Sequence, residues 1–296
     1  MRILIVGKNG QLGRHLVEKL NCLAVICAVD IQELDISDQL AVNNRVQQDQ
    51  PDIIINAAAY TAVEQADNEV EQAFKVNNDG VKFLAQAAKN IGAVIIHIST
   101  DYVFDGSKIL PYSEMDAALP QNVYGKSKLA GEGEVIQICP EHIIIRTAWL
   151  FSEQSNNFVS TMLKLGQKHN ELSIVDDQWG GPTYAGDLAD AIVHIVEQFK
   201  QAGTVDWGVY HFSGWPHVTW YQFAQIIFNY AYEQKMINKV PKLLSISSKA
   251  YPSNVNRPVN SRLNCTKIKE RFGIDMGDWA KALPHVIEQL IDKDPM

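Results

Sequence analysis

The chain has 296 residues, about twice the length of a common single domain, which suits one large α/β domain or a domain with an added lobe. Hydrophobic residues make up 46% of the chain and charged residues 20%, so the composition excludes an intrinsically disordered protein. Acidic residues outnumber basic ones by 34 to 26, a formal charge of −8 that argues against binding to nucleic acid or to an anionic membrane surface.

The cysteines and the apolar runs indicate a cellular compartment. Cys22, Cys27, Cys139 and Cys265 show no CxxC spacing, so we expect free thiols in a reducing compartment and no cysteine-bound metal. The apolar start of the chain is too short for a signal peptide, and no apolar run approaches the roughly 18 residues that a membrane helix needs. We therefore expect a cytoplasmic protein without a membrane segment.

Along the first half, short apolar runs alternate with longer amphipathic ones. The predicted strands are Arg2–Val6, Ala24–Val29, Asp52–Ala57, Val94–Ser99 and Ile143–Thr147. The predicted helices between them are Gln11–Leu20, Ser37–Gln48, Glu69–Ile91 and Val123–Ile138. Continuous runs such as Ile53–Ile55 suit strands that are buried on both faces. The pattern predicts an α/β fold with a Rossmann-type doubly wound parallel sheet, in which ligands bind beyond the carboxyl ends of the strands.

After residue 150 the rhythm loosens, and Gly, Pro and Asp become common in the connections. Helical patterns return at Asp187–Phe199, Thr219–Tyr232 and Trp279–Ile291. We interpret residues 1–150 as the Rossmann domain and residues 151–296 mainly as a smaller substrate-binding lobe. Elements near residues 187–210 are expected to pack back onto the sheet, so no clean boundary can be drawn.

A glycine triplet follows the first predicted strand and opens the first predicted helix. Gly7 permits a tight turn, Gly10 lets backbone N–H groups approach a pyrophosphate, and Gly13 allows close packing of helix on strand. The N-terminus of the helix adds partial positive charge toward the phosphates. The spacing is GxxGxxG, not GxGxxG, and an ordinary βα turn is the alternative. The context favours binding of NADH or NADPH.

Asp30 ends the second predicted strand, where dinucleotide-binding folds place a carboxylate on the adenosine ribose. This position favours NADH, but Lys8 and Arg14 lie near enough in the sequence that NADPH stays open. A surface carboxylate at a strand end is the alternative. The third strand runs into three alanines, Ala57–Ala59, which would let a dinucleotide lie flat or which reflect tight helix packing.

Tyr124 and Lys128 are the strongest chemical signal, because residues four apart share one face of a helix. A lysine ammonium near a phenol lowers its pKa from about 10, so the phenol can exchange a proton with a carbonyl or an alcohol. Ser99 and Thr100 follow the fourth strand and offer hydroxyls at the same edge of the sheet. Together with the glycine loop, these residues predict a carbonyl reductase.

Short motifs spread over essentially the whole chain carry a resemblance. They are GKNGQLG at 7–13, NAAAYTAV at 56–63, STDYVF at 99–104, NVYGKSKLAGE at 122–132, RTAW at 146–149, NNF at 156–158 and RPVNSRL at 257–263. With these motifs the chain resembles the dTDP-4-dehydrorhamnose reductase family of the extended short-chain dehydrogenases/reductases. The resemblance implies NAD(P)H-dependent reduction of the 4-keto group of dTDP-4-dehydro-L-rhamnose to dTDP-L-rhamnose, the last step in making this activated sugar.

The resemblance also implies roles for individual residues. Tyr124 is the proton donor, Lys128 lowers its pKa and holds the nicotinamide ribose, and Thr100 hydrogen-bonds the reacting oxygen. Asp101 and Trp149 fall where the family contacts the sugar nucleotide. The positions that match the cofactor contacts are Gly10, Gln11 and Leu12 for the pyrophosphate, Asp30 for the ribose, Asp35 and Ile36 for the adenine side, and Ala59, Tyr60 and Thr61 for the cofactor's edge.

Two further expectations concern a phosphate and a metal. Arg257 is the candidate for the substrate pyrophosphate, because a guanidinium suits bidentate phosphate binding; a surface arginine is the alternative. Some members of the family are described as metal-linked dimers that use surface glutamates, and His15 stands at one such position here. We therefore expect no metal ligand, and the chain is either a monomer or a homodimer.

Two alternatives to this function stay open. A reductase, epimerase or dehydratase acting on another nucleotide sugar would share the glycine loop and the Tyr124/Lys128 pair. A dehydratase would place an acidic pair after the fourth strand, where Asp101 has no adjacent Glu. A non-catalytic, cofactor-binding regulatory subunit resembling that of methionine adenosyltransferase is the second. The sequence does not separate NADH from NADPH, nor does it identify the base and sugar apart from the resemblance.

Overall fold

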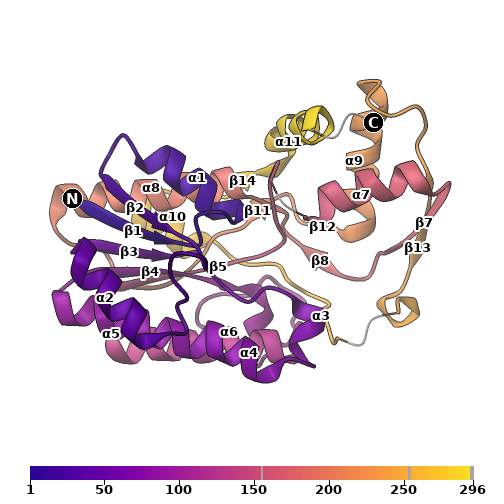
Figure 1. Cartoon of the computed structure of the whole chain (residues 1–296). Helices are drawn as coiled ribbons and strands as arrows, with labels where there is room; N and C mark the ends of the chain where they lie inside the picture. The colour runs from indigo at the N-terminus through magenta and orange to yellow at the C-terminus, as the bar shows by residue number, and fades with distance from the viewer. Residues whose placement is uncertain (155, 253–254, 294–296) are drawn as a thin grey trace.

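The computed structural model describes residues 1–154, 156–252 and 255–293. Its centre, within these residues, is a parallel six-stranded sheet in the order β10-β5-β4-β3-β1-β2 (Figure 1). The strands are β1 (Arg2–Val6), β2 (Val25–Val29), β3 (Ile53–Asn56), β4 (Val94–Thr100), β5 (His142–Thr147) and β10 (Gly208–His211). The order turns back at β1 and β3, which confirms the predicted doubly wound sheet and creates a crevice at its carboxyl edge.

Helices cover both faces of the sheet, as the continuous apolar strands require. Ile3, Ile5 and Ile53 face α1 and α8, while Leu4 and Ile54 face α2, α5 and α6 (Figure 1). The alternation of neighbouring residues between two separate cores is the period-2 pattern of a strand buried on both sides. The helices and turns of this part are α1 (Gln11–Leu20), α2 (Gln39–Asp49), α3 (Val63–Ala66), α4 (Val70–Phe74), α5 (Val81–Ile91), η2 (Asp101–Val103), α6 (Val123–Ile138), α8 (Ala185–Ala202) and α10 (Thr266–Phe272).

The predicted single helix over Glu69–Ile91 is interrupted. Between α4 and α5 the chain forms a π-helical segment, η1 (Lys75–Gly80). The extra residue turns Asn77 toward the loop after β3, where its side chain binds both backbone groups of Tyr60 at 2.9 and 3.0 Å. Segments of this kind often occur at functional sites, and here the interruption connects the helix to the edge of the sheet where ligands bind.

The second half of the chain builds a lobe and also returns to the sheet. The elements of the lobe are β6 (Leu150–Phe151), α7 (Phe158–Lys168), β7 (Glu171–Val175), β8 (Trp179–Gly180), β9 (Thr183–Tyr184), β11 (Gly214–Trp215), β12 (Val218–Thr219), α9 (Trp220–Glu233), β13 (Lys242–Ile246), η3 (Ser248–Ala250), β14 (Gly277–Asp278) and α11 (Trp279–Lys293). Its core is rich in aromatic residues such as Phe151, Phe223 and Trp279. Neither α7 nor β10 was predicted from the sequence. No helix in the described part of the chain is long and apolar enough to span a membrane.

Candidate active site

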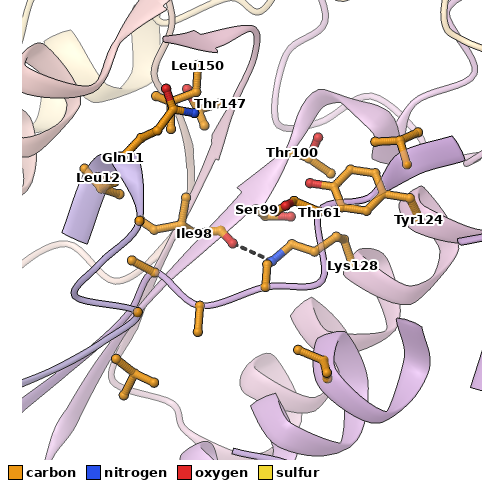
Figure 2. Close-up of a pocket in the computed structure, with 18 of the residues that line it drawn as sticks. Gln11, Leu12, Thr61, Ile98, Ser99, Thr100, Tyr124, Lys128, Thr147 and Leu150 are labelled. Carbon is orange, nitrogen blue, oxygen red and sulfur yellow. Dashed lines mark hydrogen bonds between the residues drawn. The ribbon is translucent and has the colours of Figure 1, made fainter. Parts of the chain in front are cut away.

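A cavity of about 600 Å³ lies at the carboxyl edge of the sheet. Its walls come from the segments that follow β1, β2, β3, β4 and β5, and from the first turns of α6 (Figure 2). Trp149, Leu150 and Asn156 add a wall from the start of the lobe. The cavity therefore joins the place where a dinucleotide lies in such a sheet to the region where the lobe can hold a second ligand.

The glycine loop forms a cradle for an anion. Gly7 has a φ of +88°, and a Cβ at this position would lie 2.7 Å from the backbone N of Ala58. A Cβ at Gly13 would lie 2.0 Å from the carbonyl oxygen of Gly7, so only glycine lets α1 pack this closely. At Gly10, by contrast, a Cβ would meet only the oxygen of Gly7, at 3.4 Å, and α1 begins there without a side-chain cap. The free N–H groups at the start of α1 line open space, which fits a pyrophosphate.

Two neighbours of the loop face the cavity and also connect it to the lobe. Gln11 and Leu12 both line the cavity (Figure 2). The Gln11 side-chain oxygen accepts hydrogen bonds from Ser152 and Asn157, each at 3.1 Å. One side chain thus connects the glycine loop to the start of the lobe.

Asp30, at the end of β2, shapes the same loop. Its carboxylate accepts hydrogen bonds from the backbone N–H groups of Asn9 and Ile31, each at 2.8 Å. Asp35 and Ile36 continue the cavity wall beyond it. The position of Asp30 agrees with contact to a ribose, while its bonds to the backbone give it a structural role as well.

The loop after β3 supplies the opposite rim. Ala59 and Thr61 line the cavity, whereas the Tyr60 hydroxyl donates to Glu69 at 2.9 Å and the Tyr60 backbone is held by Asn77. Asn77 does not line the cavity itself, but it holds the loop that does, and the sequence reasoning missed it. It stands within the helical pattern of 69–91, and a buried polar residue on such a face was the available signal.

Tyr124 lies in the first turn of α6, just after Asn122, whose side chain caps the helix by accepting from the Gly125 N–H at 2.8 Å. Burial raises the pKa of Tyr124 above its ordinary value of 10, while a hydrogen bond with Thr100 opposes the rise. The ring packs edge to face against the ring of Tyr102, with the two ring centroids 5.5 Å apart. At neutral pH the hydroxyl is therefore protonated and faces the cavity beside Thr100 (Figure 2), the form that a proton donor needs.

Lys128 lies one turn further along α6 and is buried with only 2% of its surface exposed. Its Nζ donates to the carbonyl of Ile98 at 2.7 Å (Figure 2), and burial lowers its pKa to about 8. The pKa of Tyr124 responds here to burial, Thr100, Asp101 and Tyr102. The expectation that Lys128 lowers the pKa of Tyr124 thus stays a prediction for the enzyme with its ligands.

The segment after β4 contributes Asp101, which is buried beside Thr100 and accepts from its hydroxyl at 3.1 Å. Burial raises the pKa of Asp101 to about 6. Trp149 faces the cavity from the other side with a left-handed φ of 49° and stacks on Trp220 of α9, with ring centroids 3.4 Å apart. Trp220 is a second residue that the sequence reasoning missed, and only the lobe's packing shows its role.

Arg257 lies next to the cavity wall. Its guanidinium binds Glu64 of α3 at 2.8 Å and hydrogen-bonds Tyr102, which lines the cavity. Its role toward a pyrophosphate stays a prediction. His15 of α1 lies 3.3 Å from Glu153. Among the described residues, no group of three or more side chains of types that bind metals is assembled.

Comparisons with known proteins agree with this geometry. The family model of the RmlD substrate binding domain matches residues 1–291. A dTDP-4-dehydrorhamnose reductase of Aggregatibacter actinomycetemcomitans is 46% identical, over 96% of this chain and 98% of that protein. The crystal structure of such a reductase from Clostridium acetobutylicum has a TM-score of 0.91, with 38% identity over 98% of this chain and 99% of that one. The Bacillus anthracis reductase in complex with NADP has a TM-score of 0.88, with 36% identity over 97% and 99%.

The doubly wound sheet, the glycine cradle and the Tyr124/Lys128 pair on one helix define an extended short-chain dehydrogenase/reductase. Similarity of this kind extends over nearly the full length of both the chain and its relatives. The chain belongs to the dTDP-4-dehydrorhamnose reductase family, which confirms the resemblance inferred from the motifs.

Proposed function

We propose that this protein reduces the 4-keto group of dTDP-4-dehydro-L-rhamnose with NADH or NADPH and forms dTDP-L-rhamnose, the last step in the synthesis of this activated sugar. The observation that carries the proposal is the protonated Tyr124 hydroxyl beside Thr100, at the end of a cavity that begins at the glycine cradle. The reductase names of relatives up to 46% identical support the substrate.

The chemistry needs a proton at the oxygen that becomes an alcohol. The reduced nicotinamide, when bound, supplies the hydride to the carbonyl carbon. Tyr124 donates its phenolic proton to the carbonyl oxygen, and Thr100 holds that oxygen in place. Lys128 supplies positive charge near the phenolate that remains. Thr100 and Lys128 are buried, and Tyr124 is half-buried at the cavity, which limits access of water and strengthens their electrostatic effect on the developing charge.

The cofactor's other end would be held by the glycine cradle. In this proposal the pyrophosphate binds Gly10, Gln11 and Leu12, and Asp30 binds the adenosine ribose. Asp35 and Ile36 border the adenine, and the segment 59–61 borders the cofactor's edge. The Bacillus anthracis reductase of known structure binds NADP, which supports the same class of cofactor here.

The sugar nucleotide would lie between η2 and the lobe. Asp101 and Trp149 contact the sugar in this proposal, and Arg257 binds the pyrophosphate after release from Glu64. We also propose a cytoplasmic location, supported by four cysteines that are all free, and a monomer or a homodimer without a bridging metal.

The test compares the wild type with Tyr124→Phe in a coupled assay. The substrate is generated in situ by the upstream dehydratase and 3,5-epimerase, and oxidation of NADH and NADPH is followed by absorbance. Since Phe removes the acid and leaves the glycine cradle intact, we expect turnover to fall by orders of magnitude, about 10²–10⁴-fold, with the cofactor Kd nearly unchanged. Near-normal turnover in Tyr124→Phe rules out the assigned role.

A further inference from the structure

A buried chain of polar side chains leads to Lys128 from below the cavity. Asn56 ends β3 and lies directly opposite His97 of β4, on the face of the sheet that α6 covers. Asn56 and His97 have no exposed surface. The Asn56 Nδ2 lies 3.2 Å from the His97 Nδ1, and the Lys128 Nζ lies 3.4 Å from the His97 Nε2. His97 therefore stands between an amide and the amine of Lys128.

Asn56 determines which nitrogen of His97 carries the proton. The backbone N–H of Ala58 donates to the Asn56 Oδ1 at 3.1 Å, which fixes the oxygen on the side away from the ring. The NH₂ group, which only donates, then faces the His97 Nδ1. Nδ1 must accept, so a neutral ring carries its proton on Nε2. The ring is neutral because burial and the charge of Lys128 hold its pKa well below the ordinary value.

We propose that His97 is a positioning residue for Lys128: held in one tautomer by Asn56, it presents its Nε2–H to Nζ and makes the ammonium of Lys128 easier to deprotonate. The inference rests on the proposed function, in which Lys128 acts beside Tyr124. An ammonium has only donors, whereas an amine has a lone pair that can accept from Nε2–H while its own N–H donates to Ile98.

The other groups around Lys128 act on its proton in known directions. Glu132, one turn along α6, raises the pKa of Lys128 by its charge. That carboxylate is itself held by Arg146 of β5, at 2.6 Å, and by Ser99 of β4. On the cavity side Lys128 lies near Tyr124 (Figure 2), and Asp101 lines the same cavity. Burial opposes Glu132 by lowering the pKa of Lys128, and His97 of β4 is, in this proposal, the neighbouring group that acts in the same direction.

The tautomer can be measured without any turnover. Two-bond ¹H–¹⁵N correlation spectra of the ¹⁵N-labelled protein without ligands show which ring nitrogen of each histidine is protonated, and His97 is assigned by its absence in His97→Asn. We expect the proton on Nε2 and no titration between pH 6 and 9. A proton on Nδ1 overturns the proposal, because the ring would then accept from the ammonium and stabilise it.

The second readout is catalytic: the pH at which kcat/KM for the reduction falls on the alkaline side of its pH profile, called here the alkaline limb. In the wild type we expect activity to fall as Lys128 loses its proton, with the limb near pH 8. His97→Asn places an amide near Nδ1 only and removes the donor to Lys128, so the limb should move to higher pH by about one unit. His97→Gln places an amide NH₂ near the Nε2 position and should restore the limb of the wild type.

A matched control separates this effect from general loss of stability. His142 of β5 is also buried, and its ring bonds the carbonyl of Cys139 at 2.6 Å, away from the cavity. His142→Asn should leave the limb in place. An unmoved limb in His97→Asn, or an equal shift in His142→Asn, overturns the proposal. If neither the wild type nor any variant turns over the sugar nucleotide, the proposed function fails. The tautomer measurement still decides the role of His97 in that case.

Discussion

Asp101 is a buried carboxylic acid whose pKa is raised by its surroundings, which gives it a distinct effect on stability. Between its ordinary pKa of 3.8 and its folded value of about 6, the folded protein binds this proton more tightly than the unfolded chain does. The contribution of protonated Asp101 to the free energy of unfolding is complete below pH 4 and is lost as pH rises through 6. At neutral pH the ionised group lowers the free energy of unfolding by about 3 kcal/mol at most.

Asp101→Asn removes this titration and keeps the oxygen that accepts from Thr100. We expect the free energy of unfolding of the variant to exceed that of the wild type by about 2 kcal/mol at pH 7.5 and by much less at pH 4, as measured by urea unfolding. We also expect a higher KM for the sugar nucleotide, because a proposed contact is altered.

Asp105 provides the opposite control. Hydrogen bonds from Tyr112 and Ser107 lower its pKa, so its contribution is present above pH 4 and is lost as pH falls. Asp105→Asn should therefore destabilise more at pH 7.5 than at a pH well below 3.8. Equal pH dependence in the two variants would contradict the assigned environments.

At the scale of elements, the site depends on how closely α6 packs on the π-helical segment η1. A Cβ at Gly131 of α6 would lie 2.1 Å from the carbonyl oxygen of Asn77, whereas a Cβ at Gly133, two residues along the same helix, would meet nothing within 4 Å. The first glycine permits the contact that positions Asn77, and the second only weakens the helix.

The two alanine variants should therefore act in opposite directions. We expect Gly131→Ala to lower the free energy of unfolding by about 1–3 kcal/mol, since η1 must shift. Gly133→Ala should raise it by about 0.5–1 kcal/mol, as alanine favours the helix. Denaturant unfolding of both measures this difference, and a stabilised Gly131→Ala would show that the packing of α6 on η1 is looser than described.

The elements also show what can be predicted from sequence. The strands β1 to β5 were predictable because each is a short apolar run and helices separate them along the chain. The break in the helix over 69–91 was not, because it depends on Asn77 meeting Tyr60 and on Gly131 meeting Asn77. Contacts between elements 17 or more residues apart leave no local periodicity to read.

At the scale of the whole molecule, the cavity is lined by residues from both the sheet's carboxyl edge and the start of the lobe. Gly10 faces open space in the cavity, so Gly10→Ala should change the stability of the ligand-free protein by about 1 kcal/mol or less. The added methyl group fills space proposed for the pyrophosphate. NADPH at a hundred times its Kd should stabilise the wild type by about 2.7 kcal/mol, and Gly10→Ala should lose most of this gain at the same concentration.

Urea unfolding with and without NADPH measures both quantities in one series. The variant Tyr124→Phe serves as the control, because it changes the acid and leaves the cradle intact, and it should keep the full gain. A full gain in Gly10→Ala would contradict the position assigned to the pyrophosphate.

The whole fold was predictable only in part, because many of its contacts join elements that are far apart in the sequence. The glycine triplet and the Tyr124/Lys128 pair are local patterns, and the sheet could be inferred from its rhythm. The lobe depends on pairs such as β7 with β13, some 71 residues apart, and β10 pairs with β5 from 65 residues away. The Trp149–Trp220 stack arises in the same way, so the cavity wall that the lobe contributes could not be predicted from sequence alone.

The central claim is transfer of hydride to a sugar carbonyl with Tyr124 as the proton donor. The most direct test supplies NADPH deuterated at the transferring position of the nicotinamide C4, together with dTDP-4-dehydro-L-rhamnose, and locates the label by NMR and mass spectrometry. We predict one deuteron at C4 of dTDP-L-rhamnose with the wild type and almost none with Tyr124→Phe in the same time. No label in the sugar, or equal labelling by both proteins, would contradict the account.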